Sequence, residues 1–355
     1  MKWEEYEKNY RGIAKLKNKD DAYCIEQLQY AKILYDKNVP IIYNQEHFSK
    51  LVGYSYDYLI GASNGAKSYY RTFYINKSNG KKRRIDEPLP NLKEIQYWIL
   101  HEILEKISIS PYAKAYIKDK SIRENARFHK KQKKILCMDI EDFFGSISYN
   151  RVLSVFRKLG YRENVSVLLA NLCCLNKALP QGAPTSPILS NIIASSLDYK
   201  ISEYVKKENI RYTRYADDLT FSGDFSEGHL ISSVERICNK YGFVINNKKT
   251  RVRKKNQRQE VTGIVVNEKM QINAEKRKHI RAEAYYIKKY GYQSHIEYHG
   301  IKRERYLYHL IGMSSYALFI NPYDENMKSY LAVFKKALND EKLIQSGNNM
   351  ATSTQ

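Results

Sequence analysis

Two adjacent carboxylates, Asp217 and Asp218, are the side chains whose types and spacing point most directly to chemistry. The residues on either side, 210–216 and 219–222, are rich in strand-forming types, so the sequence predicts a hairpin with the two acids at its tip. Adjacent carboxylates repel each other. A fold keeps such a pair either because a divalent cation neutralises it or because the turn is solvated and inert, and the pair alone leaves both interpretations open.

A third acid, Asp139, closes the short apolar run 135–140, which is typical of a buried strand that delivers a carboxylate at its end. Hydrophobic spacing predicts further elements in the order of a split βαββαβ sheet: a helical insertion at about 150–178, a helix over 187–205, the acidic hairpin, a helix over 228–240 and a strand over 243–246. In that arrangement the end of the first strand lies beside the hairpin tip. We therefore expect Asp139 next to Asp217 and Asp218.

Three converging carboxylates need cations to offset their repulsion. Two magnesium ions, which prefer oxygen ligands, meet that need, and manganese is an expected substitute. The chemistry predicted is in-line phosphoryl transfer, in which one ion activates a hydroxyl nucleophile and the other neutralises a triphosphate and its leaving pyrophosphate.

Two further stretches suit a nucleotide. Loop 179–187 is rich in Pro and Gly, and we expect Ser186 to be the N-cap and Pro187 the first residue of the following helix, whose free N–H groups would face a phosphate. A turn over 78–80 leads into four consecutive cations at 81–84, which predicts a basic hairpin strand facing a phosphate. A run of charges can equally be a solvated surface.

Composition restricts the partners of the chain. Among 355 residues, 60 Lys and Arg outnumber 38 Asp and Glu, giving a formal net charge of +22, and a hydrophobic fraction of 43% supports a folded core. A strongly basic protein with 32 tyrosines is suited to nucleic acid, because cations bind phosphates and aromatic rings stack on bases. The 5 cysteines have no paired CxxC spacing, which fits a reducing compartment. With a charged amino terminus and no run of about 18 apolar residues, we expect a soluble, cytoplasmic protein without a membrane partner.

The motifs resemble, in order, those of reverse transcriptases: Asp139 with Phe143-Phe144, the loop Leu179-Pro180-Gln181-Gly182-Ala183-Pro184-Thr185-Ser186-Pro187, and Tyr215-Ala216-Asp217-Asp218. The resemblance implies that Asp139 and Asp217 are the principal metal ligands and Asp218 the third acid. It also implies that Gln181 and Gly182 line the incoming nucleotide.

Three more roles follow from the same resemblance. Lys82 and Arg83 are similar to residues that grip the triphosphate, and Lys249 to the lysine that protonates pyrophosphate. Phe144, five positions after Asp139, matches the aromatic steric gate that excludes a ribose 2′-hydroxyl. Neighbours on a strand point to opposite faces, so we expect one of Phe143 and Phe144 to belong to the core.

Two flanking motifs resemble those of retron reverse transcriptases. Asn125-Ala126-Arg127-Phe128-His129 is similar to their NAxxH motif, and Val261-Thr262-Gly263 to their VTG motif. The resemblance implies RNA contacts at Asn125, His129, Val261, Thr262 and Gly263. A lone histidine in a helix is otherwise more often a packed or capping residue.

The fold expected is α+β: a right-hand polymerase with a ferredoxin-like palm of antiparallel sheet plus helices, with fingers and a mostly helical thumb. Its thumb should bind RNA through Lys276, Arg277 and Arg281. The expected division is an N-terminal helical extension over 1–75, fingers over 76–134, palm over 135–260 with interleaved helical fingers at 150–186, primer grip and thumb over 261–344, and a disordered tail over 345–355.

Taken together, the resemblance implies an RNA-directed DNA polymerase of a retron that copies part of a cognate structured non-coding RNA into single-stranded DNA using deoxynucleoside triphosphates. It further implies priming from a guanosine 2′-hydroxyl, a branched RNA–DNA product, and a role in antiphage defence with an effector protein. No acidic cluster suggests a ribonuclease H domain, so template removal is expected from a host ribonuclease H. The alternatives are a group II intron-like or abortive-infection reverse transcriptase, or a non-catalytic RNA-binding scaffold of the same fold.

Overall fold

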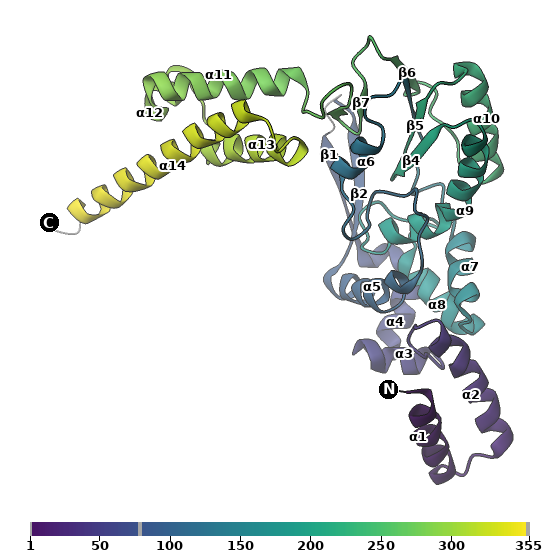
Figure 1. The fold of residues 1–355 in the computed structure, drawn as a ribbon. Helices are drawn as coiled ribbons and strands as arrows, with labels where there is room; N and C mark the ends of the chain where they lie inside the picture. The colour runs from purple at the N-terminus through teal and green to yellow at the C-terminus, as the bar shows by residue number, and fades with distance from the viewer. Residues whose placement is uncertain (1, 77–79, 353–355) are drawn as a thin grey trace.

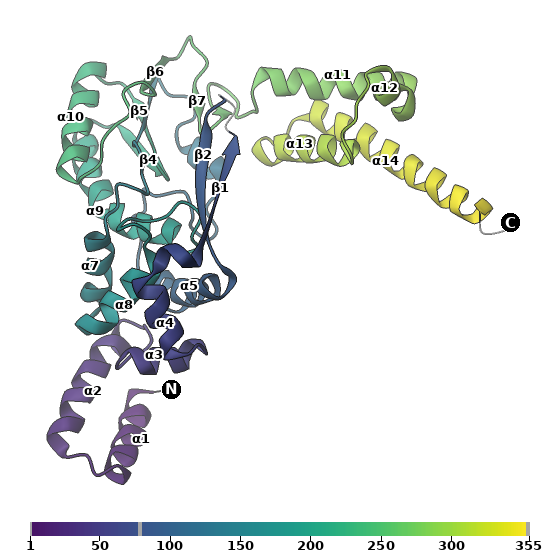
Figure 2. The same ribbon diagram turned by 180° about the vertical axis from the view of Figure 1, so that it is seen from behind.

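The computed structural model describes residues 2–76 and 80–352, with side chains described as far as residue 343. Its body combines a four-stranded sheet with helices. An arm made of the last helices of the chain, α11 to α14 (residues 274–352), projects from one side of the body (Figure 1). The first two helices extend from the opposite end of the body, and the view from behind shows the same separation (Figure 2).

The central sheet is antiparallel throughout, with strand order β4-β5-β3-β6. The strands are β3 (Lys134–Asp139), β4 (Arg211–Tyr215), β5 (Asp218–Gly223) and β6 (Arg251–Lys254). Because side chains alternate between the two faces of a sheet, the register separates them by chemistry. One face carries Leu136, Met138, Leu219 and Phe221, all buried in the main core, and the other carries Asp139 and Asp218.

The fourth strand differs from the expectation. Residues 243–246 make only an isolated bridge, between Ile245 and Ile140, and the edge strand is β6 instead. Phe243 and Ile245 are buried, so their apolar character reflects burial and the strand predicted there was wrong. Hydrophobicity reports which side chains leave water, whereas pairing depends on register that the sequence does not specify here.

The helices of the body are α7 (Tyr149–Leu159), α8 (Glu163–Cys173), α9 (Ser186–Lys207) and α10 (Glu227–Lys240). The expected helical insertion therefore forms α7 and α8, and the helices expected over 187–205 and 228–240 are confirmed as α9 and α10. Helix α9 begins one residue earlier than expected, with Thr185 rather than Ser186 as the N-cap. The Thr185 hydroxyl makes no capping hydrogen bond, so the capping chemistry inferred from Ser186 was wrong.

The N-terminal part contains α1 (Trp3–Leu16), α2 (Asp21–Asp36), α3 (Gln45–Val52), α4 (Tyr56–Asn64) and the 3₁₀ helix η1 (Ala66–Tyr69). A hairpin follows, made of β1 (Tyr70–Asn76) and β2 (Lys82–Pro88), so the stretch expected to be helical to residue 75 already enters a strand at Tyr70. Of the turn expected at 78–80, Ser78 and Asn79 lie outside the described residues. Helix α5 (Pro90–Glu102), the 3₁₀ helix η2 (Leu104–Lys106) and helix α6 (Ile122–Phe128) lead to the central sheet.

A small hairpin, β7 (Glu260–Val261) and β8 (Ile264–Val265), lies beside the central sheet. The C-terminal arm follows as α11 (Ala274–Tyr290), α12 (Tyr292–Tyr298), α13 (Tyr306–Ile320) and α14 (Glu325–Thr352). A second hydrophobic core, which includes Ile280, Leu310 and Phe334, packs these helices together and extends into the body through Ala126 and Ile135. Helix α14 continues to Thr352, so the tail expected to be disordered from residue 345 is helical to that point, because no Pro interrupts the helix that precedes it. Residues 353–355 lie outside the described residues.

Two smaller expectations concern the whole chain. All five cysteines lie within the described residues and are free thiols, which agrees with the absence of a predicted disulfide framework. No helix among the described residues has both the length and the apolar character needed to cross a membrane.

Candidate active site

The sheet brings the three predicted acids together. Asp139 is the last residue of β3 and is paired in register with Asp218, the first residue of β5. Asp217 occupies the turn between β4 and β5, and its carbonyl accepts a hydrogen bond from the N–H of Ile140 at 2.9 Å. Ala216 holds a left-handed backbone conformation at φ 57°. The tight turn therefore places both hairpin acids beside the end of β3.

The electrostatics of these acids show mutual repulsion. Burial, followed by the charges of Asp217 and Asp139, raises the pKa of Asp218 to about 7. The pKa of Asp217 is also raised, first by burial and then by Asp139. Groups that interact in this way are common at functional sites, because structural carboxylates are normally neutralised by partners.

Lys249 supplies the positive charge nearest to these acids. Its ammonium Nζ donates to both carboxylate oxygens of Asp139, at 2.8 and 2.9 Å, and the hydrogen bond to Asp139 is the largest cause of the raised pKa of Lys249. More than half of the lysine side chain remains exposed to solvent. The contact therefore pairs a largely exposed ammonium with Asp139 at the end of β3.

Three carboxylates are hard oxygen donors of the kind that magnesium prefers. Within the described parts of the chain, no three acidic, histidine or cysteine side chains are arranged closely enough to hold an ion as they stand. The ammonium of Lys249 occupies the oxygens of Asp139 instead. These oxygens fit a divalent cation once Lys249 releases the carboxylate of Asp139. The pKa values of Asp217 and Asp218 are raised because both acids are buried beside other carboxylates, and a bound cation would offset that charge.

A buried ion pair supports the hairpin from its other face. Arg214 and Asp198 are both fully buried, and two parallel hydrogen bonds of 2.8 Å join the guanidinium to the carboxylate. The same guanidinium donates to the carbonyl of Ala216 at 3.1 Å and to the side chain of Asn191 at 3.0 Å. The network thereby fixes the residue that immediately precedes Asp217.

The predicted nucleotide residues lie at the β1–β2 hairpin and the loop before α9. The carbonyl of Gln181 accepts a hydrogen bond from the N–H of Asp86 in β2 at 2.9 Å. At Gly182, with φ +137°, a Cβ atom would lie 2.7 Å from the backbone oxygen of Asp86, so only glycine fits. Arg83 lies close enough to lower the pKa of Asp217, and Lys82 is exposed at the start of β2. These contacts dock the basic hairpin against the loop.

Phe143 is buried in the core, whereas Phe144 is partly exposed, as expected of a pair in which one ring is structural. The ring of Phe144 lies 6.4 Å from that of Tyr116. Tyr116, at φ 59°, also has its pKa raised by Asp217 after the larger effect of burial. Sequence reasoning missed Tyr116, because its proximity to Asp217 arises only in the folded chain.

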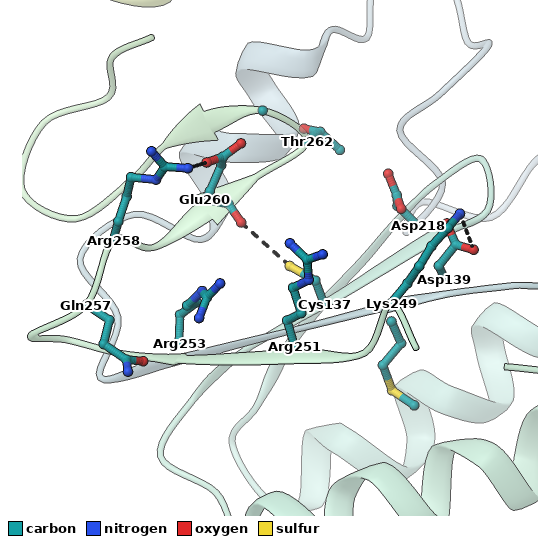
Figure 3. A pocket seen from close by; sticks show the side chains of 12 residues that line it. Cys137, Asp139, Asp218, Lys249, Arg251, Arg253, Gln257, Arg258, Glu260 and Thr262 are labelled. Atoms are coloured by element: carbon teal, nitrogen blue, oxygen red, sulfur yellow. Dashed lines mark hydrogen bonds and ion pairs between the residues drawn. The ribbon is translucent and has the colours of Figure 1, made fainter. Parts of the chain in front are cut away.

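A pocket of about 590 Å³ opens beside Asp139 and Asp218 (Figure 3). Three arginines that sequence reasoning did not single out also line it: Arg251, Arg253 and Arg258. Thr262 and Gly263 of the VTG motif, in the turn between β7 and β8, form part of its wall. The alternation of Arg251 and Arg253 in a basic strand was the available signal, but the misplaced fourth strand concealed it.

The NAxxH residues do not form an exposed RNA surface. Asn125 and His129 are completely buried, and His129 bonds to the hydroxyls of Ser222 at 2.7 Å and Thr213 at 2.8 Å. Thr213 donates its single hydroxyl proton to Asn125 at 2.6 Å, so His129 Nε2 donates to Thr213 and Nδ1 accepts from Ser222. Burial lowers the pKa of His129 to about 3. The direct RNA contacts expected of Asn125 and His129 are therefore corrected to a structural role.

The VTG motif is divided between core and surface. Val261 is fully buried in the C-terminal core and so is not an RNA contact, whereas Thr262 is partly exposed and Gly263 exposed. The Asn125 side chain approaches the Thr262 hydroxyl at 3.4 Å, which joins the two motifs. Among the predicted arm cations, Lys276 and Arg281 are exposed, while Arg277 is ion-paired with Asp324.

Fold and site together define a nucleic-acid polymerase. The family model "Reverse transcriptase (RNA-dependent DNA polymerase)" matches residues 75–302. The retron Ec86 reverse transcriptase of Escherichia coli is 39% identical over 255 residues, which cover 70% of this chain and 79% of that protein. Two Myxococcus xanthus proteins, the retron Mx162 and Mx65 reverse transcriptases, are 35% and 32% identical, over 56% and 72% of this chain and 47% and 62% of their own lengths.

Among solved structures, a telomerase from Candida albicans in complex with a fragment of telomeric RNA aligns with a TM-score of 0.45 at 12% identity, over 77% of this chain and 63% of that one. The family model and the retron relatives assign the family of this chain, and the telomerase alignment is not used for that assignment. The chain belongs to the reverse transcriptases of retron type, which are RNA-directed DNA polymerases. Members of this family depend on divalent metal ions.

Proposed function

We propose that this chain binds a cognate structured non-coding RNA and reverse transcribes part of it into multicopy single-stranded DNA. The observation that carries the proposal is the convergence of Asp139, Asp217 and Asp218 at the end of β3 and β5, with raised pKa values on the two hairpin acids. A non-catalytic scaffold gains nothing from maintaining that repulsion. A polymerase uses it to bind the cations that phosphoryl transfer requires.

The proposed reaction joins a primer hydroxyl to an incoming deoxynucleoside triphosphate. The hydroxyl oxygen forms a bond to the α-phosphorus, the bond from that phosphorus to its bridging oxygen breaks, and pyrophosphate leaves as the hydroxyl loses its proton. Two magnesium ions held by Asp139, Asp217 and Asp218 would supply nucleophile activation and charge neutralisation. Manganese would substitute for them.

The other residues have separate proposed tasks. Lys82 and Arg83 hold the triphosphate, Gln181 and Gly182 line the nucleotide, and Phe144 excludes a ribose 2′-hydroxyl. Lys249, once released from Asp139, donates a proton to the departing pyrophosphate. An ordinary lysine ammonium is protonated at neutral pH, so the released side chain still carries the proton that it donates.

The RNA is proposed to bind along the exposed cations of the arm, Lys276 and Arg281 among them, and at Thr262 and Gly263. The net charge of +22 supports a polyanionic partner of this kind. Initiation from a guanosine 2′-hydroxyl, antiphage defence with an effector protein, and template removal by a host ribonuclease H complete the proposal. The support for these is that the relatives are named as retron reverse transcriptases.

The catalytic part is tested with Asp217→Asn/Asp218→Asn on a poly(rA)·oligo(dT) substrate. We expect magnesium-dependent DNA synthesis to fall at least about 1,000-fold, because the cation ligands are lost, while RNA binding measured by fluorescence anisotropy changes less than about twofold. The matched control is Asp224→Asn/Glu227→Gln, which removes one exposed and one partly exposed carboxylate beyond the other end of β5. Undiminished synthesis by the catalytic-site variant would overturn the site assignment.

The priming step is tested on the DNA that accumulates when the chain is expressed together with the DNA flanking its gene. A debranching enzyme that cleaves 2′,5′-phosphodiesters should release the DNA from its RNA. DNA that migrates identically with and without this treatment would contradict 2′-hydroxyl priming and leave the polymerase assignment intact.

A further inference from the structure

Two arginines of the edge strand β6 lie on the same face of the sheet as the catalytic acids. In the register of β3 and β6, Arg251 is opposite Cys137 and Arg253 is opposite Ile135. Cys137 is two residues before Asp139, and alternate residues of a strand share a face. Arg251 and Arg253 therefore project on the side of Asp139 and Asp218, and Figure 3 shows both in the pocket beside these acids.

The charges of this pocket do not balance locally. Lys249 is paired with Asp139, and Arg258 is paired with Glu260 at 3.0 Å. Within the described part of the chain, no ion pair or hydrogen bond engages the guanidinium of Arg251 or of Arg253. Two permanent positive charges thus face a cavity without an anionic partner, and a guanidinium pair of this kind is suited to a phosphate.

The shape of the pocket leaves room for such a group. Its volume of about 590 Å³ exceeds that of one phosphate and accommodates a nucleotide as well. Its far wall is the β7–β8 hairpin, held to the sheet by a contact of 3.6 Å between the Cys137 thiol and the carbonyl of Glu260. At the rim, Gly263 has no neighbouring atom within 4 Å of where a Cβ would be. The pocket therefore stays open to a strand that enters beside Gly263.

The position of these arginines differs from that of the proposed triphosphate site. Strand order β4-β5-β3-β6 puts Arg251 and Arg253 at the β6 edge, with the acids between them and β4. Arg83 acts on Asp217 and on Tyr116, whose segment runs beside β4. The two cationic groups thus lie on different sides of the acids, Arg83 on the side of the proposed triphosphate site and the two arginines at the β6 edge.

We propose that Arg251 and Arg253 form a subsite for the phosphate attached to the 3′-oxygen of the priming nucleotide. The inference rests on the proposed 2′-hydroxyl priming. A nucleotide that attacks through its 2′-oxygen keeps the 3′-phosphodiester that continues its RNA strand, on the neighbouring carbon of the same ribose. An ordinary primer, which attacks through a 3′-hydroxyl, carries no charge there. The subsite therefore selects an internal guanosine over a strand end.

The test uses two fluorescent RNA hairpins with a template overhang, each ending in a guanosine with a free 2′-hydroxyl. One carries a 3′-phosphate and the other a 3′-hydroxyl, and their dissociation constants are measured by anisotropy. The wild-type protein should bind the 3′-phosphate form at least about fivefold more tightly, because its phosphate meets two guanidinium groups. Arg251→Gln/Arg253→Gln should remove that preference. The matched control, Lys254→Gln/Lys255→Gln, removes two charges from the end of the same strand and should keep it.

Three results would overturn the inference. The first is equal binding of both hairpins by the wild-type protein. The second is an arginine variant that binds both hairpins more weakly to the same degree, which would indicate a general backbone contact. The third is a variant that keeps the 3′-phosphate preference but has a raised KM for deoxynucleotides and weaker inhibition by pyrophosphate, which would assign the arginines to the leaving group. Extension of an ordinary DNA primer is measured in parallel, since its absence in the wild type would contradict the proposed polymerase function itself.

Discussion

The two ends of the β4–β5 hairpin treat polar groups in opposite ways. At its tip, Asp217 and Asp218 repel each other, and burial raises the pKa of Asp218 to about 7. Towards its base, Thr213 and Ser222 bond to His129, whose pKa burial lowers to about 3. Burial shifts pKa values at both ends. Only at the base are the buried side chains paired by hydrogen bonds, between His129 and the hydroxyls of Ser222 and Thr213. Unrelieved charge marks the site that acts on a ligand, and completed hydrogen bonds mark the structure that holds it.

The contrast also gives the two ends opposite dependences on pH. Asp218 has a folded pKa above its unfolded value of 3.8, so the stability it contributes is present at low pH and is lost as the pH rises through about 7. His129 has a folded pKa below its unfolded value of 6.5, so protonation of the unfolded chain lowers stability as the pH falls below about 6.5. Each effect amounts to about 2 kcal/mol between pH 7 and 5, with opposite sign.

The largest expected effect comes from the ion pair behind the hairpin. Arg214→Leu leaves the carboxylate of Asp198 buried without its partner and removes the hydrogen bond to Ala216, so we expect the free energy of unfolding in urea to fall by about 4 kcal/mol. Arg214→Leu/Asp198→Leu removes both charges and should lose less stability than the sum of the losses of Arg214→Leu and Asp198→Leu. Additive losses in this double-mutant cycle would contradict a coupled pair.

The base of the hairpin gives the next effect. His129→Gln cannot serve both Thr213 and Ser222 with the imidazole geometry, and we expect unfolding stability at pH 7 to fall by about 2 kcal/mol. Relative to the wild type, the variant should also become more stable between pH 7 and 5, because the buried histidine that opposes protonation is absent. RNA affinity of the folded protein should stay within about twofold. A large loss of RNA affinity at unchanged stability would indicate that His129 contacts RNA directly, contrary to its burial in the structure.

The smallest effect concerns the cation at the tip. Lys249→Gln removes the proposed proton donor and should lower kcat about tenfold. It should also lower the magnesium concentration needed for half-maximal activity, because no ammonium then competes for the oxygens of Asp139. Lys248→Gln, at the exposed neighbouring position, is the control. If the variant needs more magnesium than the wild type, Lys249 does not compete with the ion for Asp139 but helps to position the carboxylates that bind it.

Much of the hairpin tip could be predicted from the sequence. Asp139, Asp217 and Asp218 follow from a strand that ends in an acid and a turn between two strands, which are local patterns. Helices α9 and α10 were found by their spacing for the same reason. Phe143 is buried and Phe144 partly exposed, as expected, but both lie in the turn after β3, so strand alternation is not the reason for the difference.

The base of the hairpin and the β6 edge could not be predicted, because they depend on pairing between distant segments. His129 meets Ser222 and Thr213 only after α6 packs on the sheet, at separations of 93 and 84 residues. Arg251 and Arg253 join the active-site face only through their register with β3. The position of Asp198 in a helix does not indicate that it forms a buried ion pair with Arg214. Motif resemblance located Asn125 and His129 but assigned them to RNA, since a motif does not report burial.

The most direct test of this account is the unfolding free energy of Asp218→Asn at pH 8 without divalent cations. The amide removes the repulsion with Asp217 and Asp139, so the account predicts a variant more stable than the wild type by about 2 kcal/mol, allowing for the partial exposure of the side chain, and without polymerase activity. Added magnesium should stabilise the wild type and leave the variant nearly unchanged. A variant that is equally stable or less stable than the wild type in the absence of metal would contradict the claim that repulsion between buried carboxylates destabilises the hairpin tip until a cation binds.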